Sequence, residues 1–296
     1  MREVRVKSVL NRHKKRDPWF LDDYSVNPYA GCSFNCLYCY IRGSKYGKDM
    51  GATLAVKVNA PEVLEKQLKR RAEKGEYGII ALATSTEPYQ KIEEKTKLTR
   101  RLLEVILKYR FPVHLLTKSP LALRDMDLLR EIDREALLPL DLQERPGRGV
   151  IINYSFSTLN PALARKLEPG APPPEARLEA MEEFSKAGFL AGVSQIPALP
   201  FLSDNEEEME RFVEEASRHR AKFLFAGALT LFENSPYHSK SLYYEFLREH
   251  FPDLLPKYKS LFRIFLFPQP PRDYQKKLQA MAERLCKKYS LTPGLI

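Results

Sequence analysis

The stretch that decides the fold is Asn27-Pro28-Tyr29-Ala30-Gly31-Cys32-Ser33-Phe34-Asn35-Cys36-Leu37-Tyr38-Cys39-Tyr40. It holds three of the four cysteines of the chain, in the spacing Cys-x3-Cys-x2-Cys. Thiolates are the protein ligands of iron–sulfur clusters. Three thiolates on one short loop can hold three irons of a 4Fe–4S cluster, which leaves the fourth iron open to a small molecule. We therefore interpret the rest of the chain as scaffold, cofactor site and substrate site for such a cluster.

Two other interpretations of the cysteines stay open. An odd trio on one loop is a poor disulfide framework for a chain of this size, and clustered cysteines in a cytosolic enzyme more often bind metal. A zinc site needs a fourth ligand, but no Cys or His follows Cys39 within twenty residues and only His13 lies near upstream. The remaining cysteine, Cys286, is interpreted as a structural residue, so a single cluster is predicted.

The composition indicates a globular chain. Its 296 residues, 44% hydrophobic and 29% charged, suit one large α/β domain or two small ones. The longest apolar run, 223–232, is shorter than the roughly 18 residues that a membrane span requires. The basic N-terminus has no apolar core behind it and does not look like a secretory signal. We expect no membrane association and a cytoplasmic location with little oxygen, because an exposed cluster iron is easily oxidised.

The formal net charge of +10 has two explanations of equal weight. A positive surface favours polyanionic partners such as DNA or RNA. The alternative is a lysine-rich, heat-adapted surface, since only 7 Gln and 8 Asn stand beside 48 basic and 38 acidic residues, as in a thermophile.

The segment 1–23 is basic, with Arg12-His13-Lys14-Lys15-Arg16 followed by Trp19-Phe20. It is either a nucleic-acid arm whose aromatic residue stacks on a base, or a solvated tail that the two aromatic residues pin to the core. We favour the second interpretation.

Beyond the cysteine loop, apolar strands alternate with amphipathic helices about six times. The predicted strands are 24–26, 53–58, 78–83, 112–117, 150–157, 189–196 and 222–231. The predicted helices begin at 59, span 95–109 and 121–132, run from the prolines at 172–174 to Gly188, follow a capping box at 203–206, and span 273–289.

Such alternation implies right-handed crossovers and a parallel sheet. No strand is followed by G-x-G-x-x-G or a Walker A motif, so a nucleotide-binding Rossmann domain is not expected. We predict an α/β fold, a partial (β/α)6 TIM-like barrel with its function at the C-terminal ends of the strands. The predicted units are a basic N-terminal extension (1–23), the barrel (24–232) and a C-terminal helical extension that packs on the barrel (233–296).

The Cys32-x3-Cys36-x-Tyr38-Cys39 pattern after a first strand resembles the radical S-adenosylmethionine (radical SAM) superfamily. More narrowly, four motifs are similar to its spore photoproduct lyase-like branch: Asn27-Pro28-Tyr29-x-Gly31-Cys32, Cys39-Tyr40, Thr117-Lys118-Ser119 and Leu167-Glu168-Pro169. The resemblance runs from about residue 6 to 231. It implies that the open iron chelates S-adenosylmethionine and that one electron from the cluster cleaves it to a 5′-deoxyadenosyl radical. This radical abstracts hydrogen from a substrate, and a reducing partner such as ferredoxin or flavodoxin is implied.

The resemblance also implies roles for individual residues. The cluster ligands are Cys32, Cys36 and Cys39. Tyr38 packs on the adenine, Lys118 pairs with the methionine carboxylate, and each has a plain alternative as a core tyrosine or a solvent-facing lysine. The other implied cofactor-binding residues are Thr84, Ser85, Thr86 and Glu87 (methionine amino group), Ser155 and Ser157 (carboxylate or ribose), and Gln195 and Ile196 (adenine, or else simple barrel packing).

One departure leaves the reaction open. The lyase returns hydrogen from a cysteine at the end of its second strand, where this chain has Ala83-Thr84-Ser85. The tyrosines that resemble its hydrogen relay, Tyr38 and Tyr40, are present. Lyase activity on thymine lesions is therefore not predicted, although the scaffold matches.

Nucleic acid is the favoured substrate class, and a duplex would have to expose the reacting base. A radical SAM modifier of a peptide or small metabolite, and a non-catalytic protein that holds zinc or a structural cluster, are the alternatives. The candidate phosphate contacts are Arg12, Lys14, Lys15, Arg16, Arg42, Lys45 and Lys48.

Overall fold

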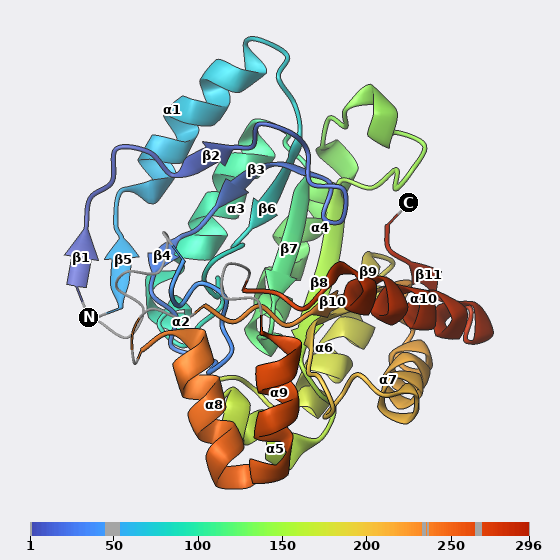
Figure 1. The fold of residues 1–296 in the computed structure, drawn as a ribbon. Coiled ribbons are helices and arrows are strands. Elements are labelled where there is room, and N and C mark those ends of the chain that lie inside the picture. Colours follow the sequence, from blue (N-terminus) through green and yellow to red (C-terminus); the bar gives the residue numbers. More distant parts are fainter. Residues whose placement is uncertain (1, 45–53, 233–234, 236, 264–267, 296) are drawn as a thin grey trace.

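The fold was obtained as a computed structural model. The structure describes residues 2–44, 54–232, 235, 237–263 and 268–295 (Figure 1). Lys45 and Lys48, and the first residue of the strand predicted at 53–58, lie outside these described residues.

The centre of the molecule is an eight-stranded sheet in the order β11-β10-β9-β8-β7-β6-β3-β2. Among the described residues, neighbouring strands of this sheet pair in parallel, except β2 with β3, which are antiparallel. In the described part of the chain no pairing joins β2 to β11, so the barrel is partial and open. The strands are β2 (Leu10–Arg12), β3 (Asp22–Val26), β6 (Ile79–Leu82), β7 (Val113–Thr117), β8 (Val150–Phe156), β9 (Leu190–Ala198), β10 (Phe223–Ala228) and β11 (Thr292–Pro293).

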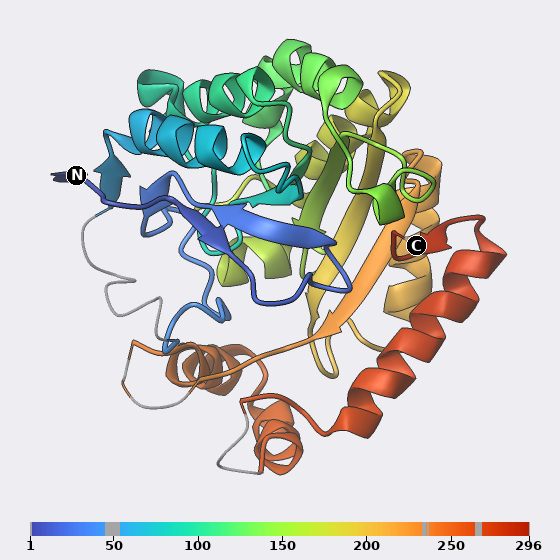
Figure 2. The same ribbon diagram turned by 90° about the horizontal axis from the view of Figure 1, so that it is seen from above.

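Helices cover the outer face of this sheet (Figure 2). Strand β6 is wholly buried because helices pack outside it and the barrel interior lies inside it, which explains its uniformly apolar sequence. The helices are α1 (Ala60–Ala72), α2 (Glu93–Thr96), α3 (Leu98–Lys108), α4 (Met126–Glu135), α5 (Pro161–Leu167), α6 (Pro174–Lys186), α7 (Glu206–Arg218), α8 (Ser239–His250), α9 (Leu255–Leu261) and α10 (Arg272–Lys288), with 3-10 turns at Pro120–Asp125, Leu140–Leu142 and Pro252–Leu254.

The alternation of strands and helices thus predicted the α/β architecture correctly, with local exceptions. The segment predicted as strand 53–58 forms β5 (Ala55–Lys57), which pairs with β1 (Arg2–Val4) and β4 (Tyr29–Ala30) in a separate small sheet. The helix predicted at 95–109 is split, because Lys97 adopts a left-handed backbone conformation with φ 48°. The helix predicted at 121–132 starts as a 3-10 turn and becomes α-helical only from Met126.

The capping box predicted at 203–206 is wrong in one respect. The residue that caps α7 is Asn205, whose side chain accepts a hydrogen bond from Glu208 N (2.9 Å). Ser203 is instead fully buried, donates to the carbonyl of Ser157 (2.7 Å) and accepts from Leu199 N (2.9 Å). Sequence spacing alone could not distinguish the two because both residue types cap helices.

The N-terminal extension is part of the barrel. Strand β2 adds an antiparallel edge to β3. Trp19 stacks on Phe225 of β10 with a ring-centroid distance of 6.2 Å, and Phe20 packs against Phe225 (5.5 Å) and His114 (5.6 Å). The two aromatic residues therefore anchor the segment, as the favoured interpretation predicted, but residues 10–12 are strand and not tail.

The C-terminal residues pack in two places. Helices α8 and α9 lie beside the cysteine loop, and their Tyr243 and Tyr258 belong to one apolar cluster with Tyr38. Helix α10 packs on β10 and buries Cys286 fully. No helix among the described residues is long and apolar enough to cross a bilayer.

Candidate active site

The cysteine loop begins where β3 ends, at the C-terminal edge of the sheet. Two residues in left-handed conformation, Gly31 (φ 81°) and Asn35 (φ 53°), turn the backbone on either side of Cys32. These residue types adopt positive φ most readily. The sequence of the loop therefore permits the tight path that gathers its three cysteines.

A second segment holds this loop in place. Leu37 N donates to Leu167 O (2.9 Å), and Gly170 N donates to Phe34 O (3.0 Å). A Cβ at Gly170 would collide with Ser33 O and come within 2.9 Å of Phe34 Cα. The Leu167-Glu168-Pro169 motif and the glycine after it thus act as a backbone support for the loop.

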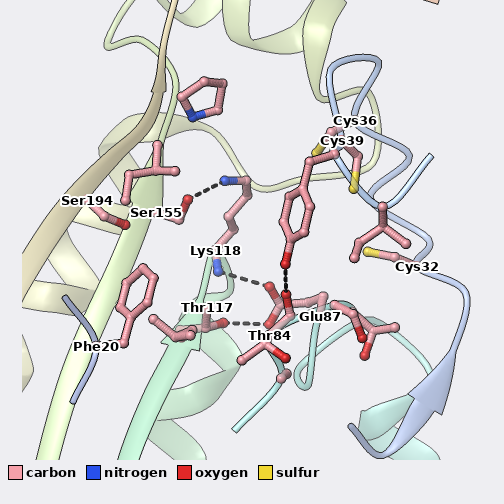
Figure 3. A pocket seen from close by; sticks show the side chains of 18 of the residues that line it. Phe20, Cys32, Cys36, Cys39, Thr84, Glu87, Thr117, Lys118, Ser155 and Ser194 are labelled. Atoms are coloured by element: carbon pink, nitrogen blue, oxygen red, sulfur yellow. Dashed lines mark hydrogen bonds between the residues drawn. The ribbon is translucent and has the colours of Figure 1, made fainter. Parts of the chain in front are cut away.

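One cavity of about 450 Å³ joins the loop to the strand ends (Figure 3). Polar residues at the ends of β6, β7 and β8 line one wall, and the cysteines line another. The predicted site residues in its lining are Cys32, Cys36, Cys39, Tyr38, Tyr40, Thr84, Ser85, Thr86, Glu87, Lys118, Ser155 and Ile196.

Two predicted site residues do not line the cavity. Strand β8 ends at Phe156, so Ser157 no longer follows its alternation, and its hydroxyl donates to Glu168 Oε1 (2.8 Å). On β9 the alternation directs Ser194 and Ile196 to the cavity and Gln195 away from it. Gln195 Nε2 donates to Ser203 O (2.9 Å). Direct contact of either side chain with a ligand in this cavity is not supported.

Glu87 is a buried carboxylate at the end of β6. It accepts hydrogen bonds from Thr117 Oγ1 (2.5 Å), Tyr89 N (3.0 Å) and Lys118 N (3.0 Å). Burial raises the pKa of Glu87, and these hydrogen bonds oppose the rise. Because its oxygens fasten β6 to β7, the carboxylate fixes the backbone next to Lys118.

A second buried carboxylate, Glu168, contacts both Lys118 at the end of β7 and Tyr38 of the cysteine loop. Arg177 Nη2 and the Tyr38 hydroxyl both donate to it, and Lys118 Nζ lies 3.8 Å from its Oε1. Lys118 Nζ also donates to Ser155 Oγ (2.7 Å). Burial alone would raise the pKa of Glu168, but Lys118 and Arg177 hold it at about 2. The site therefore contains a permanently ionised carboxylate that orients the lysine and the tyrosine.

The two tyrosines have different surroundings. Tyr38 is buried, and burial together with Glu168 raises its pKa well above the usual range, so the phenol keeps its proton. Tyr40 is about half exposed and donates to the carbonyl of Thr84 (2.5 Å). Tyr40 thus lies against the strand end where the resemblance led us to look for a cysteine.

The basic residues proposed for phosphate contact separate into two groups. Arg42 is buried, and its guanidinium donates to Cys36 O (3.1 Å) and to Asn35, so it supports the cysteine loop. Arg16 pairs with Asp23 and Asp141. The prediction of phosphate contacts is therefore not supported for these two, whereas Arg12, Lys14 and Lys15 are exposed.

Comparison with known proteins decides the family. Residues 26–215 match the Radical SAM superfamily. The chain belongs to the radical SAM superfamily. It is similar to an uncharacterized protein of Mycobacterium tuberculosis, 29% identical over 98% of this chain and 81% of the relative. An uncharacterized protein of Methanocaldococcus jannaschii is 30% identical over 62% of this chain and 63% of the relative.

The solved structures most useful for comparison are of spore photoproduct lyase. One variant has a TM-score of 0.66 and 15% identity over 97% of this chain and 78% of that chain. Another, with bound S-adenosylmethionine and dinucleoside spore photoproduct, has a TM-score of 0.65 and 16% identity over the same shares. The fold of this radical SAM protein is thus shared with spore photoproduct lyase, as the motifs predicted.

The cysteines fit the donor set of a radical SAM cluster. Burial raises the pKa of the Cys32 thiol to about 11, with a further contribution from Glu87, and burial also raises the pKa of Cys36 and Cys39. Iron ligation removes these protons outright. Within the described residues, no three His, Cys, Asp or Glu side chains are arranged around a single metal ion. Thiolates of a 4Fe–4S cluster bind separate irons and are spread further apart.

Several residues in and around this candidate site do not follow from the sequence. The sequence marks Glu168 only as part of the Leu167-Glu168-Pro169 motif and gives no signal for Arg177. Charged residues at a helix end and within a helix are usually solvated, and only the tertiary structure shows that these two are buried as an ion pair. His13, Asp17, Phe20 and Asp22 also line the cavity and were not predicted there.

Proposed function

We propose that this protein is a radical SAM enzyme that cleaves S-adenosylmethionine reductively at a 4Fe–4S cluster and abstracts hydrogen from a nucleic-acid substrate. One observation carries the proposal. The three cysteines and the polar ends of β6, β7 and β8 line the same cavity, although they are up to 123 residues apart in sequence, from Cys32 to Ser155.

We assign the cysteines to the cluster and the polar strand ends to S-adenosylmethionine. Cys32, Cys36 and Cys39 are the proposed cluster ligands. The bound cluster and cofactor supply a 5′-deoxyadenosyl radical. Lys118, held by Ser155 and Glu168, offers its ammonium group to the methionine carboxylate, and this charge-assisted contact orients the cofactor.

Other lining residues complete the cofactor site. The segment 84–87 is proposed for the methionine amino group, and Asn27 supports it, because its Oδ1 accepts from Ser85 N (3.0 Å). Ile196 gives the adenine an apolar contact, together with Tyr38, whose hydroxyl stays with Glu168. These apolar side chains also exclude water from a site where a radical must react only with substrate.

Tyr40 and Tyr38 are the proposed hydrogen-transfer residues. Tyr40 is the better placed, since it lines the cavity beside Thr84, whereas the Tyr38 hydroxyl is engaged by Glu168. If Tyr40 returns hydrogen to the substrate radical, its phenoxyl radical would have to regain a hydrogen atom, either from bound 5′-deoxyadenosine or as an electron from the reducing partner together with a proton. Only the first route would restore S-adenosylmethionine, so the amount of 5′-deoxyadenosine formed per substrate converted distinguishes the two.

Two observations support nucleic acid as the substrate class. The chain carries a net charge of +10, and spore photoproduct lyase, which shares the fold, has been solved with a dinucleoside lesion bound. We further propose a cytoplasmic, heat-adapted protein that takes electrons from ferredoxin or flavodoxin. Residues 24–232 would act as its catalytic unit, with 1–23 and 233–296 as extensions.

The test is anaerobic reconstitution followed by dithionite-driven turnover, with 5′-deoxyadenosine measured with and without damaged DNA. Replacing each of Cys32, Cys36 and Cys39 by Ala should abolish product and lower iron content. Cys286→Ala is the matched control, because this thiol is on the buried face of α10 and is not part of the cavity lining. Full activity in any loop variant, or tight zinc binding without cleavage of S-adenosylmethionine, would overturn the proposal. Cleavage without any salt-dependent nucleic-acid binding would favour a peptide or metabolite substrate.

A further inference from the structure

The wall of the cavity opposite the cysteines comes from the N-terminal segment. His13, Asp17, Phe20 and Asp22 line the cavity there, and we call these four residues the floor. Figure 3 shows Phe20 on the far side of the cavity from Cys32, Cys36 and Cys39. None of the floor residues is needed to hold the cluster or the cofactor in the arrangement proposed above.

The floor presents hydrogen-bond acceptors. His13 Nδ1 lies 3.1 Å from Asp22 Oδ2, and His13 Nε2 lies 3.3 Å from Ser25 Oγ. Asp17 Oδ1 accepts from Trp19 N and Phe20 N, both at 2.8 Å. Both of these bonds are made by Oδ1, and Oδ2 of the same carboxylate is the atom that a ligand would contact.

Two fully buried side chains also have polar atoms without a hydrogen-bond partner among the described residues. His114 Nε2 has none among the described residues, and its Nδ1 contacts Phe20 O (2.8 Å). Asn153 lacks partners at both Oδ1 and Nδ2, and strand alternation on β8 puts it on the same face as Ser155, a lining residue. Buried polar atoms are nearly always satisfied. Neither side chain is among the residues that line the cavity, so these polar atoms lie behind its lining, where buried water would satisfy them.

The N-terminal segment that supplies the floor also carries basic side chains, which face solvent. Arg12, Lys14 and Lys15 are exposed, whereas His13 between them is partly buried in the floor. Strand β2 ends at Arg12 and the chain turns at 13–15, which leaves three basic side chains in solvent beside a histidine that lines the cavity. Such a turn can contact a phosphate backbone outside the cavity and a base inside it. The carboxylates alone would suit any ligand with an amino group. The basic side chains beside them favour a ligand that also carries phosphate, as a nucleotide does.

Building on the proposed function, we propose that the floor is the base-reading subsite of the enzyme. It receives an unstacked nucleobase that carries an exocyclic amino group, such as cytosine, and Arg12, Lys14 and Lys15 bind the adjoining phosphates. Aspartate oxygens accept hydrogen bonds from the cytosine amino group. The Phe20 ring offers a face against which the base can stack. Thymine, which has no amino group, satisfies fewer of these acceptors.

The experiment measures equilibrium binding of fluorescein-labelled single-stranded oligo(dC) and oligo(dT) of equal length to the reconstituted protein. We expect oligo(dC) to bind about tenfold more tightly, the discrimination of one well-made base contact. Asp22→Asn and Asp17→Asn should bring the ratio near one. His13→Gln, at a partly exposed side chain, should lower it as well and serves if an aspartate variant unfolds. The triple variant Arg12→Gln/Lys14→Gln/Lys15→Gln should keep the ratio but reduce the salt slope by about 2, as for three phosphates on a single strand.

The outcomes separate this inference from the proposed function. A ratio of one in the unmodified protein, or a ratio unchanged in all three floor variants, overturns the base-reading role. So does an absence of nucleic-acid binding. In each of these cases dithionite-driven 5′-deoxyadenosine formation still reports on the proposed radical SAM activity, so that activity stands or falls by its own measurement.

Discussion

Glu168→Gln is the substitution for which the structure gives the sharpest expectation. Glu168 and Arg177 are both about 1% exposed and form an ion pair, and Tyr38, Ser157 and Lys118 also face the carboxylate. The amide keeps the shape of the side chain but removes its charge. Arg177 is then left with an uncompensated charge in the interior.

Two estimates of the cost agree. The pKa of Glu168 falls from 4.5 to about 2 despite burial, because Lys118 and Arg177 favour the carboxylate. At 1.36 kcal/mol per unit this corresponds to about 3 kcal/mol of stability. Removing one partner of a buried pair typically costs about 3–5 kcal/mol. We therefore expect the free energy of unfolding to fall by about 3 kcal/mol and the midpoint temperature by about 5–10 °C.

The lowered pKa of Glu168 also determines how its contribution to stability changes with pH. A depressed carboxyl pKa stabilises the fold fully above the unfolded value of 4.5, and this contribution is lost as the pH falls towards about 2. The difference in stability between Glu168→Gln and the unmodified protein should therefore be constant from pH 5 to 8. It should shrink below pH 4.5.

The assay is urea unfolding of the reconstituted protein, followed by circular dichroism at several pH values. Glu179→Gln is the matched control, since it makes the same change at an exposed position of α6 and should cost less than about 0.5 kcal/mol. A loss for Glu168→Gln no larger than that of the control would refute the reasoning. The double variant Glu168→Gln/Arg177→Met should recover part of the loss, because it removes the unpaired charge.

Three further expectations concern the loop, the cofactor and the floor. Gly170→Ala places a methyl group against Ser33 O and should lower the free energy of unfolding by about 1–3 kcal/mol. It should also lower the iron content. If both values stayed unchanged, Gly170 would not support the cysteine loop. Lys118→Gln should weaken S-adenosylmethionine binding about 10- to 100-fold in equilibrium dialysis, the worth of a bond between charged groups, and unaltered affinity would exclude the carboxylate contact. Burial raises the pKa of Asp22 to about 6 from 3.8, against the effect of His13. Stability should therefore decrease as the pH rises from about 4 to 6. Asp22→Asn should flatten this dependence, and an identical pH profile would show that the carboxyl does not titrate in this range.

The sequence by itself determined the alternating architecture and the cysteine loop. The reason is local: buried strands are short apolar runs, surface helices repeat every 3.6 residues, and the spacing of Cys32, Cys36 and Cys39 lies within one turn-rich stretch. The end of a parallel strand is also visible in sequence, since it is where polar residues resume. That is why Thr84, Lys118 and Ser155 could be assigned to one edge before the structure was known.

Only the tertiary structure decided which polar residues share the cavity. Gln195 and Ser157 have the composition of site residues, but β9 alternation and the end of β8 direct them elsewhere. The ion pair of Glu168 and Arg177, and the return of the N-terminal segment to form the floor, join positions far apart in the chain. Their energies depend on burial and on the contacts between those distant positions. No local pattern encodes either quantity, so the cysteine loop could be found in the sequence while the residues that support it and face it could not.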